Sequence, residues 1–272
     1  MSRRAHRAGP EGGPTNAGTS LSAVAAPALP APFAWQGEHV AAELPGARAL
    51  FATRRGGVSD GPYASLNLGR MTADAPEAVD ENRALLADAT GCPRAHVLYG
   101  RQVHGTTVRR ATEPPGADRP VAEEDGQATA LEHHPALVFV ADCLPVLLAA
   151  EGAVAAVHAG WRGLAGGVVA EGLAALRELG GTGPVHALVG PGARGCCYEV
   201  GEEVHAAFAG DGARVGERNL DLALVARRRL EAAGAAVVQD LGLCTICHPE
   251  LFFSHRRDAG VTGRQAGVAW RT

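Results

Sequence analysis

Three short apolar runs, separated by only a few residues, constrain the fold of this chain most. They are residues 136–141, 145–150 and 153–157. Each has the length and composition of a buried β-strand. Glu151-Gly152 separates the last two runs and fits the two-residue turn of a β-hairpin. In an antiparallel hairpin closed there, residue 145 lies opposite His158, so Cys143 comes close to His158. The sequence therefore predicts a thiol and an imidazole side by side at the end of a buried hairpin.

Glycine-rich sequence follows this hairpin. Trp161 and Arg162 are surrounded by Gly160, Gly163, Gly166 and Gly167. Residues without a Cβ let the backbone approach a ligand closely, which is typical of a binding site rather than of a core. We therefore include Arg162 among the candidate substrate-binding residues.

His104, which precedes Gly105 in the expected extended segment 96–108, is a third candidate ligand. Taken alone, each of His104, Cys143 and His158 is more commonly a buried thiol or a hydrogen-bonded histidine. Together, three nitrogen and sulfur ligands leave one tetrahedral position open. That is the arrangement of a catalytic zinc site, which activates water or polarises a substrate.

The composition excludes several classes of protein. A chain of 272 residues with 46% hydrophobic residues can bury an enzyme-sized core. The net charge of -4 gives no basic footprint for nucleic acid, and we assign the run Arg227 to Arg229 to a solvated helix face. No apolar stretch is long enough to span a membrane. All 25 basic residues are arginines, which excludes a Schiff-base lysine and a Walker A loop.

Residues 1–33 are rich in Gly, Pro, Ala, Ser and Arg without periodicity, so we expect a disordered N-terminal tail ahead of a domain at 34–272. An export signal is the alternative, but Pro27 and Pro30 interrupt its weakly apolar stretch. Six cysteines in a chain of this length are not typical of a small disulfide scaffold. We therefore expect reduced thiols and a cytoplasmic location.

The remaining pattern predicts a mixed α/β protein. A helix is expected over 76–90, capped by Asp74 and ended by Gly91. Further helices are expected at 164–179, 201–209 and 220–233, strands at 51–53, 185–189, 235–239, 251–256 and 266–270, and a surface loop at 110–126.

Three familiar motifs carry less weight. Gly57 to Gly61 matches G-x-S-x-G, and Gly190 to Gly195 matches G-x-G-x-x-G, but neither leads into a predicted helix as those motifs require. Cys244 and Cys247 have the spacing of a metal-binding pair. A structural zinc needs a second pair, and the adjacent Cys196 and Cys197 are poorly spaced for one, so we expect buried thiols there.

Four sequence blocks together match the motifs of a known protein family. They are TRRGGVS (53–59) with SLNLG (65–69), QVHG (102–105), ADCLP (141–145) with VHAGWRG (157–163), and GP (190–191), YEVG (198–201), FFSHRRD (252–258) and TGR (262–264). These blocks resemble the bacterial laccase-domain family, once described as multicopper polyphenol oxidases and now regarded as zinc-containing purine nucleoside phosphorylases. Only the N-terminal tail lies outside the resemblance.

The resemblance implies a single α/β (α+β) domain of mixed β-sheets with flanking helices, related to cysteine-hydrolase-like toxins. It implies zinc on His104, Cys143 and His158. The implied activity is phosphorolysis of adenosine, inosine and S-methyl-5'-thioadenosine, with adenosine deamination as a second reaction. Purine nucleosides and phosphate are the implied partners, and a monomer is our working expectation.

The resemblance also suggests roles for individual residues. Arg54 and Asn67 match an arginine and an asparagine of the family's first block, and an arginine fork such as that of Arg54 can hold phosphate. For the deamination, Asp142 or Asp125 is the candidate proton carrier. His255 departs from the tyrosine that many members of the family carry.

Three other functions stay open. The 11 histidines form no H-x-H pair, which argues against a four-copper oxidase, but a single copper on the same three ligands is possible. A metal-free cysteine hydrolase would use Cys143 as nucleophile and His158 or His104 as base, as in editing of cell-wall precursors. A non-enzymatic binding module is the third alternative.

Overall fold

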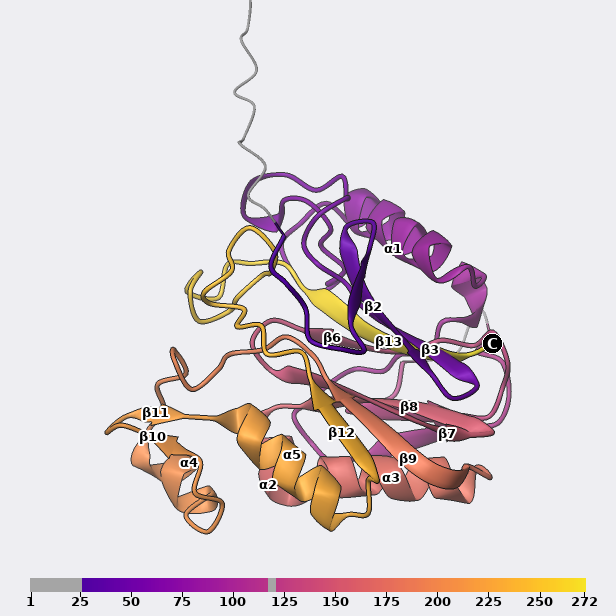
Figure 1. Cartoon of the computed structure of the whole chain (residues 1–272). Helices are drawn as coiled ribbons and strands as arrows, with labels where there is room; N and C mark the ends of the chain where they lie inside the picture. Colours follow the sequence, from indigo (N-terminus) through magenta and orange to yellow (C-terminus); the bar gives the residue numbers. More distant parts are fainter. Residues whose placement is uncertain (1–25, 117–120) are drawn as a thin grey trace, which may run out of the picture.

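Two β-sheets pack face to face and carry helices on their outer sides in the computed structural model, which describes residues 26–116 and 121–272 (Figure 1). The first sheet is antiparallel, with the order β1 (Ala34–Gln36), β2 (His39–Leu44), β3 (Ala47–Phe51), β13 (Gln265–Arg271), β6 (Ala136–Val140). The second has the order β12 (Val237–Asp240), β9 (Thr182–Val189), β7 (Leu144–Glu151), β8 (Ala153–Ala159), β5 (Gly126–Thr129), β4 (Val108–Ala111). Its two outer pairs are parallel and its inner pairs antiparallel, so the sheet is mixed as predicted.

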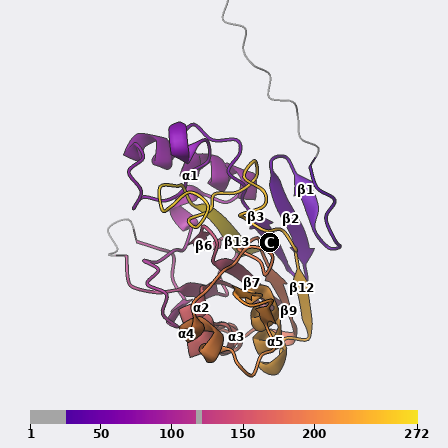
Figure 2. The ribbon, with the colours of Figure 1, turned by 90° about the vertical axis from the view of Figure 1, so that its left-hand side faces the viewer.

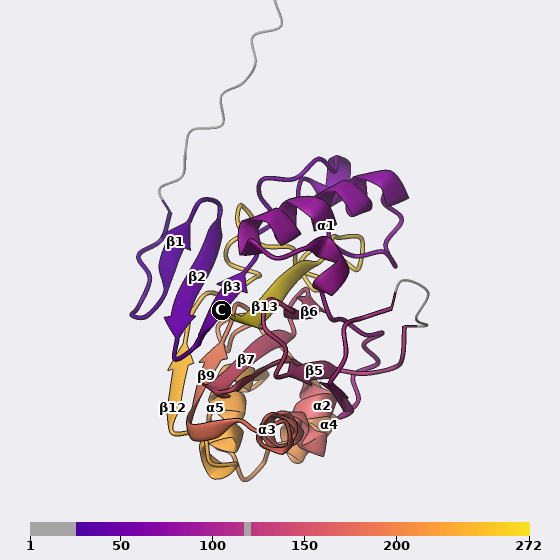
Figure 3. The ribbon, with the colours of Figure 1, turned by 90° about the vertical axis from the view of Figure 1, so that its right-hand side faces the viewer.

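The helices lie on opposite sides of the two sheets (Figure 3). Helix α1 (Pro76–Thr90) covers the first sheet, while α2 (Trp161–Gly166), α3 (Val168–Glu178) and α5 (Leu222–Ala232) cover the second. The shorter elements are η1 (Gly61–Tyr63), η2 (Arg94–His96), α4 (Glu202–Ala207), β10 (Arg214–Val215) and β11 (Asn219–Leu220). Of the helices in the described ranges, none has the length and apolar character needed to cross a bilayer.

The apolar runs are nearly continuous because β7 and β8 are buried on both faces. Along β7, Val146 and Leu148 pack in the core beneath the helices, whereas Leu147 and Ala149 pack in the core between the sheets. Alternate side chains of a strand point to opposite faces, so one strand contributes to both cores. These strands form a rigid base for the loops at their ends.

The predicted hairpin is confirmed. Pro145 pairs with His158, and Gly152 in the turn has φ 90°, a conformation that glycine adopts without strain. The helix over 76–90 is also confirmed and ends at Gly91 with φ 70°. The predicted cap is wrong, because Ala75 occupies the N-cap position and makes no side-chain capping bond.

Three other expected elements differ in the structure. The helix expected at 164–179 is two helices that begin at Trp161 and are divided at Gly167, where φ is 94°. The strand expected at 251–256 does not form, because the backbone N–H and C=O of Phe253 pair with the side-chain amide of Gln265 instead of a strand. Segment 96–108 makes only isolated bridges before β4 begins at Val108.

The first residues of the described chain contact the domain (Figure 2). The indole of Trp35 donates to the carbonyl of Pro27, 3.0 Å away, and Phe33 is buried between the sheets. The packed part of the chain therefore extends to the N-terminal side of residue 34. Residues 1–25 of the predicted tail, and residues 117–120 of the predicted surface loop, lie outside the described residues.

Candidate metal centre

His104, Cys143 and His158 meet at one end of the central hairpin. Cys143 directly precedes β7, His158 is the penultimate residue of β8, and His104 lies in the loop before β4. The Cys143 sulfur is 3.7 Å from Nε2 of His104, and the two imidazole rings are 4.8 Å apart at 76°. One ligand atom from each of the three residues lies within 4.8 Å of the others. His104 is exposed and His158 is buried, so the centre is open to solvent on one side.

Asp125 orients both histidines. Its carboxylate is completely buried and accepts hydrogen bonds from the backbone N–H groups of Val103, His104 and Gly105 and from Nδ1 of His158. Because Nδ1 of His158 is held 2.8 Å from this carboxylate, Nε2 is the nitrogen left for a ligand. Despite its burial, these donors lower the pKa of Asp125. Asp125 therefore positions the centre, and its saturated, buried carboxylate does not fit the proton-carrier role considered above.

Two residues beside the centre have unusual backbone conformations. His104 has φ 62° and Asp142 has φ 90°, in the region that side chains other than glycine rarely adopt. Such conformations persist only where surrounding contacts enforce them, and they are frequent at functional sites. Gly160 completes the centre, since a Cβ there would lie 2.9 Å from His104 and 3.1 Å from the sulfur of Cys143.

The charges of Cys143 and His158 stabilise each other. Burial by itself raises the pKa of the Cys143 thiol, but His158 and His104 lower it to about 6. Burial likewise lowers the pKa of His158, and Cys143 and Asp125 raise it to about 9. A thiolate is the form of cysteine that binds metal ions. Two imidazoles and one thiolate, braced by a buried carboxylate, fit a metal ion such as zinc and leave a coordination position open.

Further polar side chains lie around the centre. Tyr198 lies in the loop after β9, and burial together with the charges of Cys143 and Asp142 raises its pKa to about 12. It therefore stays a neutral hydroxyl near pH 7. Arg264, just before β13, is close enough to Cys143 and Asp142 to interact electrostatically with both. Sequence reasoning assigned no role to Tyr198 or Arg264, although both lie in the YEVG and TGR blocks.

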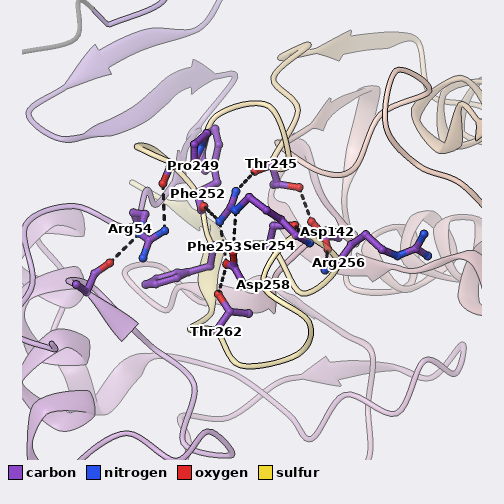
Figure 4. Close-up of polar contacts among 12 residues, drawn as sticks. Arg54, Asp142, Thr245, Pro249, Phe252, Phe253, Ser254, Arg256, Asp258 and Thr262 are labelled. Atoms are coloured by element: carbon purple, nitrogen blue, oxygen red, sulfur yellow. Dashed lines mark hydrogen bonds and ion pairs between the residues drawn. The ribbon is translucent and has the colours of Figure 1, made fainter. Parts of the chain in front are cut away.

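Asp142 is held by the segment between β12 and β13 (Figure 4) and by the loop after β9. Its Oδ1 accepts a hydrogen bond from the hydroxyl of Thr245 at 2.6 Å, and its Oδ2 accepts one from the backbone N–H of Arg256 at 2.7 Å. Its backbone carbonyl accepts one from the N–H of Ala193. These contacts fix the residue that directly precedes Cys143.

The other predicted substrate-binding residues differ in their surroundings. Arg54 lies over the ring of Phe253, and it donates to the carbonyls of Ala64 and Pro249 (Figure 4). Asn67 is fully buried, with its amide nitrogen bonded to Thr72 and Asp74. Its oxygen accepts from the backbone N–H groups of Gly69 and Arg264. Arg162 is exposed and stacks on Trp161.

The fold and the centre together define a mixed α/β protein with an open His–Cys–His cluster that fits a metal ion. Residues 48–272 match the family described as multi-copper polyphenol oxidoreductase laccase. The chain belongs to this family.

Relatives and solved structures of similar sequence extend over nearly the whole domain. A purine nucleoside phosphorylase of Corynebacterium glutamicum is 42% identical over 232 residues, which cover 82% of this chain and 94% of the relative. A purine nucleoside phosphorylase of Streptomyces coelicolor is 41% identical over 238 residues, which cover 83% of this chain and 96% of the relative. The hypothetical protein YfiH of Bacillus licheniformis, a solved structure, has a TM-score of 0.82 at 29% identity and covers 89% of this chain and 100% of its own.

Proposed function

We propose that this protein is a purine nucleoside phosphorylase. The observation that carries the proposal is the solvent-open centre of His104, Cys143 and His158, in a chain that is about two-fifths identical to proteins named purine nucleoside phosphorylase over nearly their whole length. The reaction transfers the pentose from the base to phosphate. Adenosine, inosine and S-methyl-5'-thioadenosine are the proposed substrates.

Cationic side chains around the centre supply the charge that phosphate requires. Arg264 is close enough to Cys143 to interact with it electrostatically. The exposed guanidinium of Arg162 interacts in the same way with Tyr198. Arginine binds phosphate oxygens with two parallel hydrogen bonds. We assign phosphate binding to Arg162 and Arg264, with Arg54 as a third contributor through the part of its guanidinium that Ala64 and Pro249 do not occupy.

The departing base needs a donor for the charge that develops on its ring nitrogens. Tyr198 is suited to this role because its hydroxyl keeps its proton near neutral pH. A zinc ion held by His104, Cys143 and His158 would supply a Lewis acid beside the substrate. Asn67 and Asp142 act on this site indirectly: Asn67 accepts a hydrogen bond from the backbone N–H of Arg264, and Asp142, which directly precedes Cys143, is itself held by Thr245, Arg256 and Ala193.

We propose adenosine deamination as a second reaction of the same centre. Its support is the three-ligand arrangement with an open position, which suits addition of water to the purine ring. A cytoplasmic location, with the thiols reduced, stays a prediction.

One assay tests both reactions. Purified protein of known metal content is incubated with adenosine, with and without phosphate, and adenine, inosine and hypoxanthine are separated by chromatography. Phosphate-dependent adenine that is lost in Cys143→Ala supports the phosphorylase, and inosine formed without phosphate supports the deaminase. If neither product forms with metal bound, the nucleoside assignment is wrong.

The role of Arg54 has its own test. Replacing Arg54 by Ala should raise the Michaelis constant for phosphate at least tenfold, about 1.4 kcal/mol, with little change in that for the nucleoside. Arg101→Ala, which removes an exposed arginine that forms an ion pair with Glu123, serves as the control. An unchanged phosphate constant in Arg54→Ala removes this residue from phosphate binding.

A second candidate function is a cysteine hydrolase. Cys143, His158 and Asp125 have the order of a nucleophile, a base and an orienting carboxylate, and the His158–Asp125 contact is 2.8 Å. The two functions differ in the state of the thiol. A metal-bound Cys143 resists alkylation by iodoacetamide until a chelator is added, whereas a free catalytic thiolate reacts with or without the chelator.

A further inference from the structure

Two pairs of cysteines from segments that are distant in sequence meet outside the His–Cys–His centre. They are Cys196, Cys197, Cys244 and Cys247, and their sulfur atoms all lie within 4.8 Å of one another. The sulfur of Cys247 is 3.6 Å from that of Cys196 and 3.3 Å from that of Cys197. Cys196 and Cys247 are exposed, so the expectation of four buried thiols is wrong.

Sheet topology explains why the two pairs meet. Strands β9 and β12 are parallel neighbours, and the carboxyl ends of parallel neighbours lie at the same edge of the sheet. The loop after β9 carries Cys196 and Cys197, and the loop after β12 carries Cys244 and Cys247. A bridge between Gly192 and Cys244 joins the two loops. The four sulfurs are thus brought together by the backbone, independently of any cross-link.

The separations of these sulfurs match a tetrahedral metal site. Zinc–sulfur bonds of about 2.3 Å in a tetrahedron place the sulfurs about 3.8 Å apart. The sulfur of Cys247 lies 3.6 and 3.3 Å from those of Cys196 and Cys197, and no two of the four sulfurs are more than 4.8 Å apart, so the observed distances bracket the tetrahedral value. A disulfide requires about 2.05 Å, so the four sulfurs are present as free cysteines.

The backbone around Cys244 also suits a metal-bound thiolate. The backbone amides of Arg194, Ile246 and Cys247 lie near enough to the buried Cys244 to favour the charged form of its sulfur. Hydrogen bonds from amides stabilise a negatively charged sulfur.

We propose that Cys196, Cys197, Cys244 and Cys247 bind a second zinc ion with a structural role. Four thiolates fill all positions of a tetrahedral ion and leave none for a substrate, unlike the three ligands of the His–Cys–His centre. The adjacency of Cys196 and Cys197, which argued against such a site in the sequence, does not prevent both sulfurs from reaching the cluster. Binding releases the thiol protons to solvent and involves no redox change.

This site fixes the two loops that hold Asp142. Thr245, between the two ligands of the C-x-x-C turn, donates its hydroxyl to Oδ1 of Asp142 (Figure 4). Ala193, in the other loop, donates its N–H to the carbonyl of Asp142. Tyr198 directly follows Cys197. The second zinc ion therefore positions residues around the first centre without touching the substrate.

The decisive measurement is the zinc content per chain of protein purified under reducing conditions with zinc in the growth medium. The wild type should bind two zinc ions per chain. Cys143→Ala, which leaves the four-cysteine cluster intact, should keep one, and Cys247→Ser should keep one. Cys92→Ser, which removes a buried cysteine outside both clusters, should keep two. The mass of intact protein from a parallel purification without reductant is also measured.

Cys143→Ala is the informative variant, because it does not depend on whether changes in the cluster allow folding. Zinc retained at one per Cys143→Ala chain supports the proposal. A zinc-free Cys143→Ala protein overturns it, as does a mass lower by two hydrogens per chain, which would show a disulfide. A strong chelator should lower the melting temperature of Cys143→Ala, and an unchanged melting temperature contradicts a structural role.

Discussion

Asp125→Asn tests how far one carboxylate organises the metal centre. Each oxygen of Asp125 accepts two hydrogen bonds: Oδ1 from the N–H of His104 and Nδ1 of His158, and Oδ2 from the N–H groups of Val103 and Gly105. An amide in the same place has only one accepting oxygen. Whichever way the amide turns, its NH₂ group faces two donors.

The size of the effect follows from that count. A hydrogen bond to a charged group contributes about 1.5–3 kcal/mol, so the loss of two corresponds to about 3–6 kcal/mol of unfolding free energy. If the NH₂ group faces His158, the imidazole must present Nδ1 as an acceptor and carry its proton on Nε2, which then cannot bind a metal. Changes in carboxylates that orient metal-binding histidines weaken metal binding about 10–100-fold.

Urea denaturation of the metal-free protein gives the first quantity, and competition with a chromogenic chelator gives the second. Asp221→Asn is the matched control, because Asp221 caps α5 by accepting a hydrogen bond from Leu224, and asparagine caps helices equally well. We expect the control to change the unfolding free energy by less than about 0.5 kcal/mol. If Asp125→Asn is as stable as the control and binds zinc with wild-type affinity, Asp125 does not organise the centre.

Three further changes probe the surroundings of the centre. Gly160→Ala introduces a Cβ into contact with two ligands and should weaken zinc binding at least tenfold in chelator competition, whereas Gly210→Ala, with open space around it, should bind zinc normally. Thr245→Val leaves one oxygen of the buried Asp142 without its donor and should destabilise the protein by about 1–3 kcal/mol in urea denaturation; equal stability would show that Asp142 does not need this hydroxyl. Tyr198→Phe should lower kcat/KM for nucleoside phosphorolysis about tenfold, about 1.4 kcal/mol, with the zinc content unchanged, and wild-type kinetics would end its role as a donor to the base.

Local sequence predicted the part of the fold that depends on local geometry. The turn at Glu151-Gly152 fixes the register of the central hairpin, and therefore the pairing of Pro145 with His158, because a hairpin register follows from its turn. Signals at the helix ends predicted α1: the helix ends at Gly91 as expected, although its N-cap is Ala75 rather than Asp74. His104 joins this site through Asp125, a contact between distant segments that periodicity does not report.

The missed features depend on side chains that replace backbone pairing or on distant loops. Segment 251–256 is apolar enough for a strand, but Gln265 satisfies the backbone of Phe253 and removes the need for one. The adjacent Cys196 and Cys197 looked unsuitable as ligands because their partners lie in a loop that only the parallel pairing of β9 and β12 brings near. Spacing along the chain is a weak guide when ligands come from different loops.

The position of β13 has a consequence for biosynthesis. This strand lies between β3 and β6, so Phe51 pairs with Gly267, from near the other end of the sequence. Until residues 265–271 leave the ribosome, β3 and β6 each present an unpaired edge, and such edges promote association between chains. Pairing between such distant segments also makes folding slow. We expect the nascent chain to depend on chaperones until its last strand closes the sheet, and recombinant yield to improve when translation is slowed or the temperature is lowered.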